Sequence, residues 1–129
     1  MHTPPLILIV DDEENFREIF GAKLSAAGFR VETAEGAKTG IAKATSLMPD
    51  LILMDVKMPG MEGSTAVMKL REDPAMKDVK IAFLTNLGDP RHLQEIDRKF
   101  SEEFGARDYL SKTDDLDVII QRIKAILGQ

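Results

Sequence analysis

The stretch "LILMDVKMPG", residues 51–60, places an acidic side chain at the end of an apolar run. Leu51 to Met54 are four consecutive apolar residues, a pattern that predicts a short strand buried on both faces. Asp55 follows them directly, and a Pro59-Gly60 turn closes the stretch. Taken alone, a carboxylate in this position is more often a cap or turn residue than a functional group. Its role therefore depends on what the rest of the chain places beside it.

The same unit, an apolar run followed by a helical pattern, repeats along all 129 residues. Apolar residues at helical spacing follow each of the five runs. The first such helical face comprises Phe16, Ile19, Phe20, Leu24 and Ala27. This alternation predicts a single α/β domain over residues 1–129, with a doubly wound, five-stranded parallel sheet of flavodoxin-like order 2-1-3-4-5 and helices on both faces. The predicted strands are residues 6–10, 30–34, 51–54, 81–85 and 107–111.

Composition excludes several classes of function. Seventeen basic and 22 acidic residues give a net charge of −5, and no Lys/Arg cluster occurs, so direct binding to nucleic acid is not expected. The chain has no cysteine, which excludes disulfides and thiolate metal sites. The first apolar run is too short for a signal peptide or a membrane span, so we expect a cytoplasmic protein without membrane contact.

Polar side chains follow four of the predicted strands. Asp11 and Asp12 follow the first strand, Asp55 the third, Thr85 ends the fourth, and Lys112 follows the fifth. In the predicted strand order the three carboxylates converge, and such a cluster of like charges is tolerated mainly when a cation such as Mg²⁺ neutralises it. A hydroxyl and an ammonium beside them could hold the oxygens of an anion. Together these groups predict a phosphoryl acceptor site in which Asp55 is the nucleophile.

The motifs "VDDEENF", "PDLILMDVKMPGMEG", "LT" and "YLSK" make the chain similar to the receiver domains of two-component response regulators, from about Pro5 to Leu127. The resemblance implies the CheY-like fold and a phosphoacceptor signalling domain rather than an enzyme. It implies that Asp55 receives a phosphoryl group from a sensor histidine kinase or a histidine phosphotransfer protein.

The resemblance also assigns the other site residues. Asp12 would bind Mg²⁺ (or Mn²⁺) directly, Asp11 largely through water, and Lys57 through its backbone carbonyl. The phosphoryl oxygens would be held by Thr85 and Lys112, which the family uses for this purpose. Tyr109 would be the aromatic switch residue that moves inward with the threonine. A partner or a second copy would bind a face formed by the fourth helix, which starts at Asp89-Pro90, with the fifth strand and fifth helix.

The sequence departs from the family pattern at three places. Thr113 stands where a cis-proline usually follows the lysine, so we predict a trans Lys112–Thr113 bond, because a non-proline cis bond costs about 2.5–4 kcal/mol. Asn86 replaces the usual Ala or Gly; it would either slow phosphoryl turnover in both directions or only start the next loop. Lys57 and Leu87 occupy the positions that tune access and phosphoryl lifetime.

Two alternatives remain. One is an interaction module of the same fold that is never phosphorylated, against which the complete Asp/Thr/Lys set argues. The other is a Mg²⁺-dependent phosphatase of the haloacid-dehalogenase type, which carries a second Asp two residues after the nucleophile. That position is Lys57 here, which disfavours the reading. The kinase, the output, the oligomeric state and the presence of an effector domain after residue 129 are left open.

Overall fold

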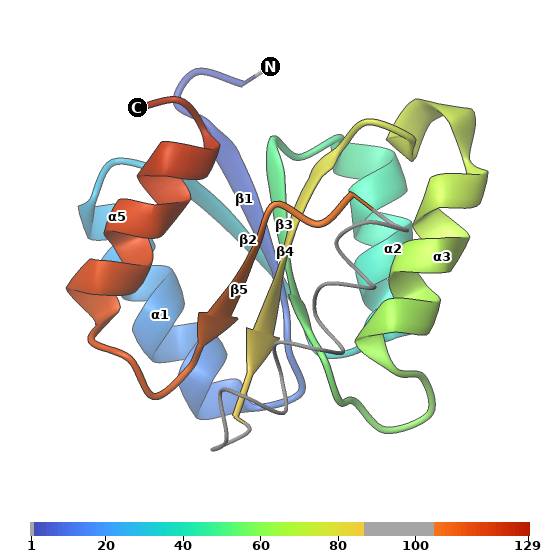
Figure 1. Cartoon of the computed structure of the whole chain (residues 1–129), viewed down its shortest axis with the longest axis horizontal. Coiled ribbons are helices and arrows are strands. Elements are labelled where there is room, and N and C mark those ends of the chain that lie inside the picture. The colour runs from blue at the N-terminus through green and yellow to red at the C-terminus, as the bar shows by residue number, and fades with distance from the viewer. Residues whose placement is uncertain (1, 87–104) are drawn as a thin grey trace.

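The computed structural model describes residues 2–86 and 105–129, arranged as a sheet between two layers of helices (Figure 1). The predicted helix that starts at Asp89-Pro90 lies outside the described residues, as does Leu87. Among the described residues, no helix combines the length and apolarity needed to cross a membrane. The elements are β1 (Leu6–Val10), α1 (Glu14–Ala26), β2 (Arg30–Ala34), α2 (Ala37–Leu47), β3 (Leu51–Asp55), α3 (Gly63–Glu72), the short 3₁₀ helix η1 (Pro74–Met76), β4 (Lys80–Thr85), β5 (Asp108–Ser111) and α5 (Leu116–Ile126).

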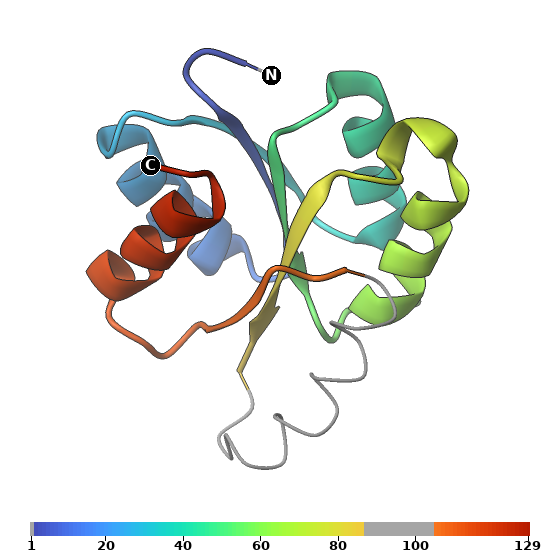
Figure 2. The same ribbon diagram turned by 45° about the horizontal axis from the view of Figure 1, so that its top comes forward.

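The five strands are parallel and lie in the order β2-β1-β3-β4-β5, which confirms the predicted topology. Their register aligns the carboxyl ends at one edge of the sheet, since Val10 pairs with Met54, Asp55 with Leu84, and Thr85 with Ser111. Figure 2 shows the strands running between the two helix layers, with both termini at the opposite edge. Residues that follow the strands are therefore brought together at the carboxyl edge.

Two apolar cores hold the helices on the sheet. Helices α1 and α5 cover one face and α2 and α3 the other (Figure 1). Alternate residues of β1 enter different cores, with Ile7 and Ile9 facing α1 and α5, and Leu8 and Val10 facing α2 and α3. All residues of β1 and β3 are buried, as expected for central strands covered on both faces.

The predicted helical faces were wrong at three positions. Ile19 is 61% exposed, because α1 contacts the core through Phe20 and Leu24, which lie about 100° and about 140° away from Ile19 around the helix. Ala27 is exposed and lies beyond the end of α1. Met48, which the sequence pattern groups with Ile41 and Ala44 in the second helix, lies outside that helix, at the C-cap of α2, with a left-handed φ of 52° and 46% exposure.

Candidate functional site

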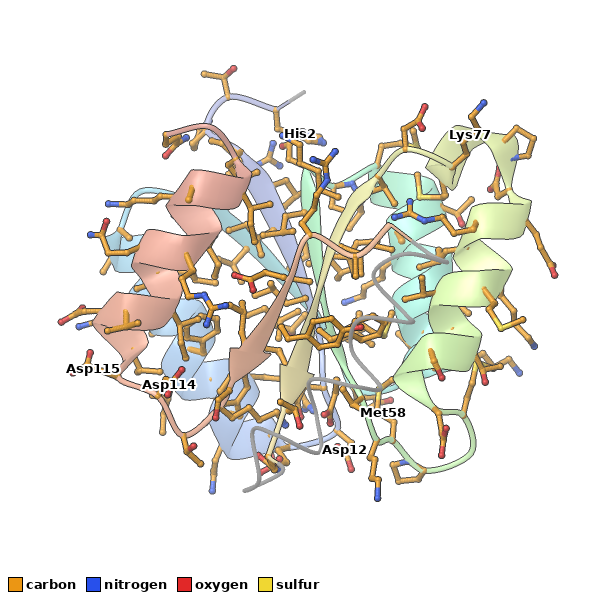
Figure 3. All side chains as sticks on the ribbon, in the orientation of Figure 1. His2, Asp12, Met58, Lys77, Asp114 and Asp115 are labelled. Atoms are coloured by element: carbon orange, nitrogen blue, oxygen red, sulfur yellow. The ribbon has the colours of Figure 1, made fainter. Side chains whose placement is uncertain are left out.

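The predicted site residues meet at the carboxyl edge of the sheet. The Asp11 N–H donates to the Ala34 carbonyl at 3.0 Å, and the Lys112 N–H donates to the Thr85 carbonyl at 2.9 Å. Both bonds continue the sheet past the ends of its strands, so the backbone fixes where these side chains start. Figure 3 shows Asp12 at this edge, with His2 at the opposite end of the sheet.

Three carboxylates form the floor and rim of the site. One oxygen each from Asp11, Asp12 and Asp55 lie within 4.8 Å of one another. Asp11 and Asp55 are buried, whereas Asp12 is exposed. The Glu13 N–H donates to Asp11 Oδ1 at 2.8 Å and orients that carboxylate. Hard oxygen donors at this spacing, with one open to water, fit a divalent cation such as Mg²⁺.

Lys112 is enclosed by these acidic groups. Its Nζ lies 2.5 Å from Asp11 Oδ2, 2.7 Å from Glu13 Oε1 and 3.4 Å from Asp55 Oδ2, and its side chain is only 4% exposed. The Phe16 ring lies beneath the ammonium, with its centroid 5.0 Å away. Burial works against the ammonium charge, but the hydrogen bonds to Asp11 and Glu13 outweigh it and raise the pKa of Lys112. The lysine is therefore a permanent cation at neutral pH.

The excess negative charge shows in the titration of the carboxylates. Burial, and then the charge of Asp11, raise the pKa of Asp55 from 3.8 to about 7, although Lys112 acts in the opposite direction. Burial also raises the pKa of Asp11. One ammonium thus leaves the acidic cluster incompletely neutralised. This is the electrostatic environment in which a bound divalent cation would be stabilised.

A cavity of about 300 Å³ opens onto the Asp55 carboxylate, and its lining joins the acidic rim to the end of β4. It has room for several waters or for a phosphoryl group, since a water occupies about 30 Å³ in the liquid. A larger hollow of about 790 Å³, beside Arg71 and Arg107, belongs to a different part of the molecule and includes none of the three aspartates. The smaller cavity is lined by Asp12, Glu13, Asp55, Val56, Lys57, Thr85 and Asn86.

Of the remaining predicted residues, Lys57 and Asn86 line this cavity, Tyr109 lies in β5, and Leu87 is outside the described residues. Asn86 Nδ2 donates to Glu13 Oε1 at 2.9 Å, a contact that was not predicted. Tyr109 is half-buried and stacks on Phe83, with ring centroids 5.3 Å apart. Lys57 lies on the cavity wall. Glu13 and Phe16 both contact Lys112, and neither was identified from the sequence as a functional residue.

The loop after Lys112 confirms the predicted trans bond and corrects a second interpretation of the sequence, in which Thr113 caps the last helix. Among the described residues the only cis peptide bond joins Thr3 and Pro4, so the Lys112–Thr113 bond is trans, as predicted. Thr113 does not cap α5; its hydroxyl instead lies 2.8 Å from Ser111 Oγ. Asp115 is the N-cap, and its carboxylate accepts from the Asp117 N–H at 2.8 Å.

A doubly wound parallel sheet with an acidic cluster, a threonine and a buried lysine at its carboxyl edge defines a phosphoacceptor signalling module. The sequence model of the response regulator receiver domain matches residues 7–124. The chain belongs to this family, whose members act in two-component signalling.

Relatives agree with this assignment. Protein PilH of Pseudomonas aeruginosa is 35% identical over 95% of this chain and 97% of its own length. The transcriptional regulator RpaA of Synechocystis is also 35% identical over 95% of this chain, which spans only 49% of RpaA and about a quarter of PleD from Caulobacter vibrioides.

Solved structures share the fold over nearly the whole chain. Chemotaxis protein CheY4 of Vibrio cholerae superposes with a TM-score of 0.83 at 28% identity, covering 95% of this chain and 98% of that one. Response regulator TrrA of Thermotoga maritima, solved in complex with Mg²⁺ and BeF, gives a TM-score of 0.80 at 30% identity, with the same coverage.

Proposed function

We propose that this chain carries a phosphoryl signal on Asp55, received from a sensor histidine kinase or a histidine phosphotransfer protein in the presence of Mg²⁺ or Mn²⁺. The observation that supports it most directly is the position of Asp55. Its carboxylate is buried at the end of β3, within 4.8 Å of the Asp11 and Asp12 oxygens and 3.4 Å from Lys112 Nζ, and it lines a cavity large enough for a phosphoryl group.

In the proposed reaction, an Asp55 carboxylate oxygen attacks phosphorus. The new O–P bond forms as the P–N bond to the donor imidazole breaks, and its electron pair leaves with the imidazole. We assign Lys112 and Thr85 to hold the phosphoryl oxygens, since both lie at the same edge. Asp11, Asp12 and Asp55, with the Lys57 carbonyl, would hold the metal, which supplies positive charge to these oxygens. Lys57, Asn86 and Leu87 would tune access and phosphoryl lifetime.

Intact-mass measurement after incubation with acetyl phosphate and Mg²⁺ tests this proposal. We expect one phosphoryl group per chain, and a fall in labelling to background when EDTA removes the metal, because the transferred phosphoryl then lacks its main counter-charge. Restoring excess Mg²⁺ should restore labelling. A chain that takes no label under any of these conditions would instead be an interaction module that works without phosphorylation.

For the output, we propose the face that contains β5 and α5 together with the predicted helix that starts at Asp89-Pro90. Two contacts support this choice. Tyr109 in β5 stacks on Phe83, two residues before Thr85 in β4, so a movement of the end of β4 would reach Tyr109 through Phe83. Arg122 in α5 donates through Nε to Asp108 Oδ2 in β5 at 2.8 Å, which ties the helix to the strand. A downstream protein or a second copy would bind this face.

Hydrogen exchange measured with and without Mg²⁺ and beryllofluoride tests the output face. We expect the largest changes in amide exchange over β5 and α5, because the stack and the ion pair couple them to the site. Helix α2, which covers the other face of the sheet, serves as the internal control and should change little. Changes confined to the region around Ile41 and Met48 would contradict this assignment.

A further inference from the structure

We propose that Glu13 is a built-in competitor of the phosphoryl group. Its carboxylate occupies, in the unphosphorylated chain, the same donors that a phosphoryl group on Asp55 would require, and it must withdraw before they become available. The inference rests on the proposed function of Asp55, and it assigns to Glu13 control over how readily that site is filled.

A single oxygen of Glu13 joins three segments over the mouth of the site. Oε1 accepts from Lys112 Nζ at 2.7 Å and from Asn86 Nδ2 at 2.9 Å. Glu13 itself precedes α1, and its own N–H is held by Asp11. The carboxylate therefore spans the cavity entrance from the β1 side to the residues that follow β4 and β5.

The donors of Lys112 are already committed to these acceptors. An ammonium has three N–H groups, and the two shortest contacts go to Asp11 and Glu13, whereas the distance to Asp55 is 3.4 Å. A phosphoryl group on Asp55 would bring additional negative oxygens into the same space. If Glu13 kept its place, like charges would lie at contact distance around one ammonium, which is unfavourable.

The burial of the two partners indicates which one moves. The Lys112 side chain is 4% exposed and packs over the Phe16 ring, so it is held in place. The Glu13 side chain is 49% exposed and can turn into solvent, where water replaces its hydrogen bonds. Withdrawal of Glu13 is thus the step that frees Lys112 and Asn86 for the phosphoryl oxygens.

A purely orienting role for Glu13 predicts the opposite effect. If the carboxylate only oriented Lys112 toward the site, its loss would leave the ammonium less well positioned and would weaken binding of a phosphoryl group. If it competes, its loss strengthens binding. The sign of the change in affinity therefore separates the two roles.

Beryllofluoride affinity at saturating Mg²⁺, followed by NMR in the full chain, gives that sign. We expect Glu13→Gln to bind about threefold to tenfold more tightly than wild type, the range for losing one partly exposed charged contact. Glu13→Asp keeps the charge but shortens the reach by one methylene, and it should shift affinity in the same direction. Glu14→Gln, an exposed neighbour with the same change in charge, should match wild type.

One further readout follows the contact itself. The side-chain amide signal of Asn86 should shift in Glu13→Gln before any ligand is added, because that change weakens the hydrogen bond from Asn86 Nδ2 to residue 13, and it should stay unchanged in Glu14→Gln. Equal affinities for Glu13→Gln and Glu14→Gln, or a weaker Glu13→Gln, would overturn the inference while leaving Asp55 as acceptor. A wild-type chain that neither binds beryllofluoride nor takes label would remove the proposed function and this inference with it.

Discussion

Asp55→Asn should reduce phosphoryl incorporation from acetyl phosphate and Mg²⁺ to background while the fold is retained. The carboxamide has nearly the same shape as the carboxylate, so the cavity and the position of Lys112 should persist. It lacks the anionic oxygen that attacks phosphorus, and no other carboxylate lies buried beside both Lys112 and the cavity among the described residues. Intact-mass spectrometry measures incorporation, and circular dichroism checks the fold.

Asp12→Asn provides the matched control for this experiment. It removes the same charge from the acidic cluster, but at the exposed rim, and leaves the buried carboxylate in place. We expect it to label more slowly, with recovery at higher Mg²⁺, whereas Asp55→Asn should not recover at any metal concentration. Undiminished labelling of Asp55→Asn would identify a different acceptor.

Asp55→Asn should also raise the free energy of unfolding above that of wild type when the metal is removed. Because the pKa of Asp55 is raised from 3.8 in the unfolded chain to about 7 in the fold, the folded state binds this proton more tightly. The free energy of unfolding should therefore fall as pH rises from about 4 to 7, with the penalty fully present above pH 7. In EDTA at pH 8, Asp55→Asn should exceed wild type by about 2–4 kcal/mol, and the difference should shrink toward pH 4.

The parts of this structure that the sequence predicts depend on repeated local patterns. The apolar runs that form β1 and β3, "LILIV" and "LILM", are short and uninterrupted, and each predicted strand is followed by helical spacing, so the parallel sheet follows from the alternation. Once the strand order is known, the residues after the strands must meet at one edge. The sequence alone therefore predicts that the acidic cluster, Thr85 and Lys112 lie together.

The contacts around Glu13 could not be predicted in this way. Glu13 lies 73 residues from Asn86 and 99 from Lys112, and which of several loop side chains bridges the mouth depends on distances that no periodicity encodes. Ile19 shows an error in the other direction, because it was predicted to face the core and is exposed. Helical spacing alone does not give the width of the helix face that the sheet buries.

The role of some glycines is also beyond what the sequence pattern can predict. Gly40 weakens the helical pattern of α2 when only propensity is considered. The structure gives its reason, since a Cβ at this position would lie 2.7–2.8 Å from the methyl groups of Val10 in β1. The close approach of a helix to a strand is a tertiary fact, and only the folded chain reveals that the small residue is needed.

Gly63 supports the site through an even closer approach. It begins α3, and a Cβ there would lie 2.1 Å from the carbonyl oxygen of Asp55 and 3.0 Å from its carbonyl carbon. The Gly63 N–H also donates to the Val56 carbonyl at 2.9 Å. Because the obstacle is backbone rather than a flexible side chain, it cannot turn aside. An added methyl group must move either α3 or the end of β3 that carries the acceptor.

Gly63→Ala should therefore destabilise the fold by about 3 kcal/mol or more and slow phosphoryl labelling in the molecules that remain folded. Gly21→Ala is the matched control, because a Cβ inside α1 would meet only Val31 Cγ1 at an ordinary 3.6 Å. Relief of the entropic cost of a helical glycine should make that variant more stable by about 0.5–1 kcal/mol. Urea unfolding measures the change in the free energy of unfolding for both variants. Wild-type stability and labelling in Gly63→Ala would mean that the end of β3 can yield, and that the backbone contact does not hold Asp55 in position.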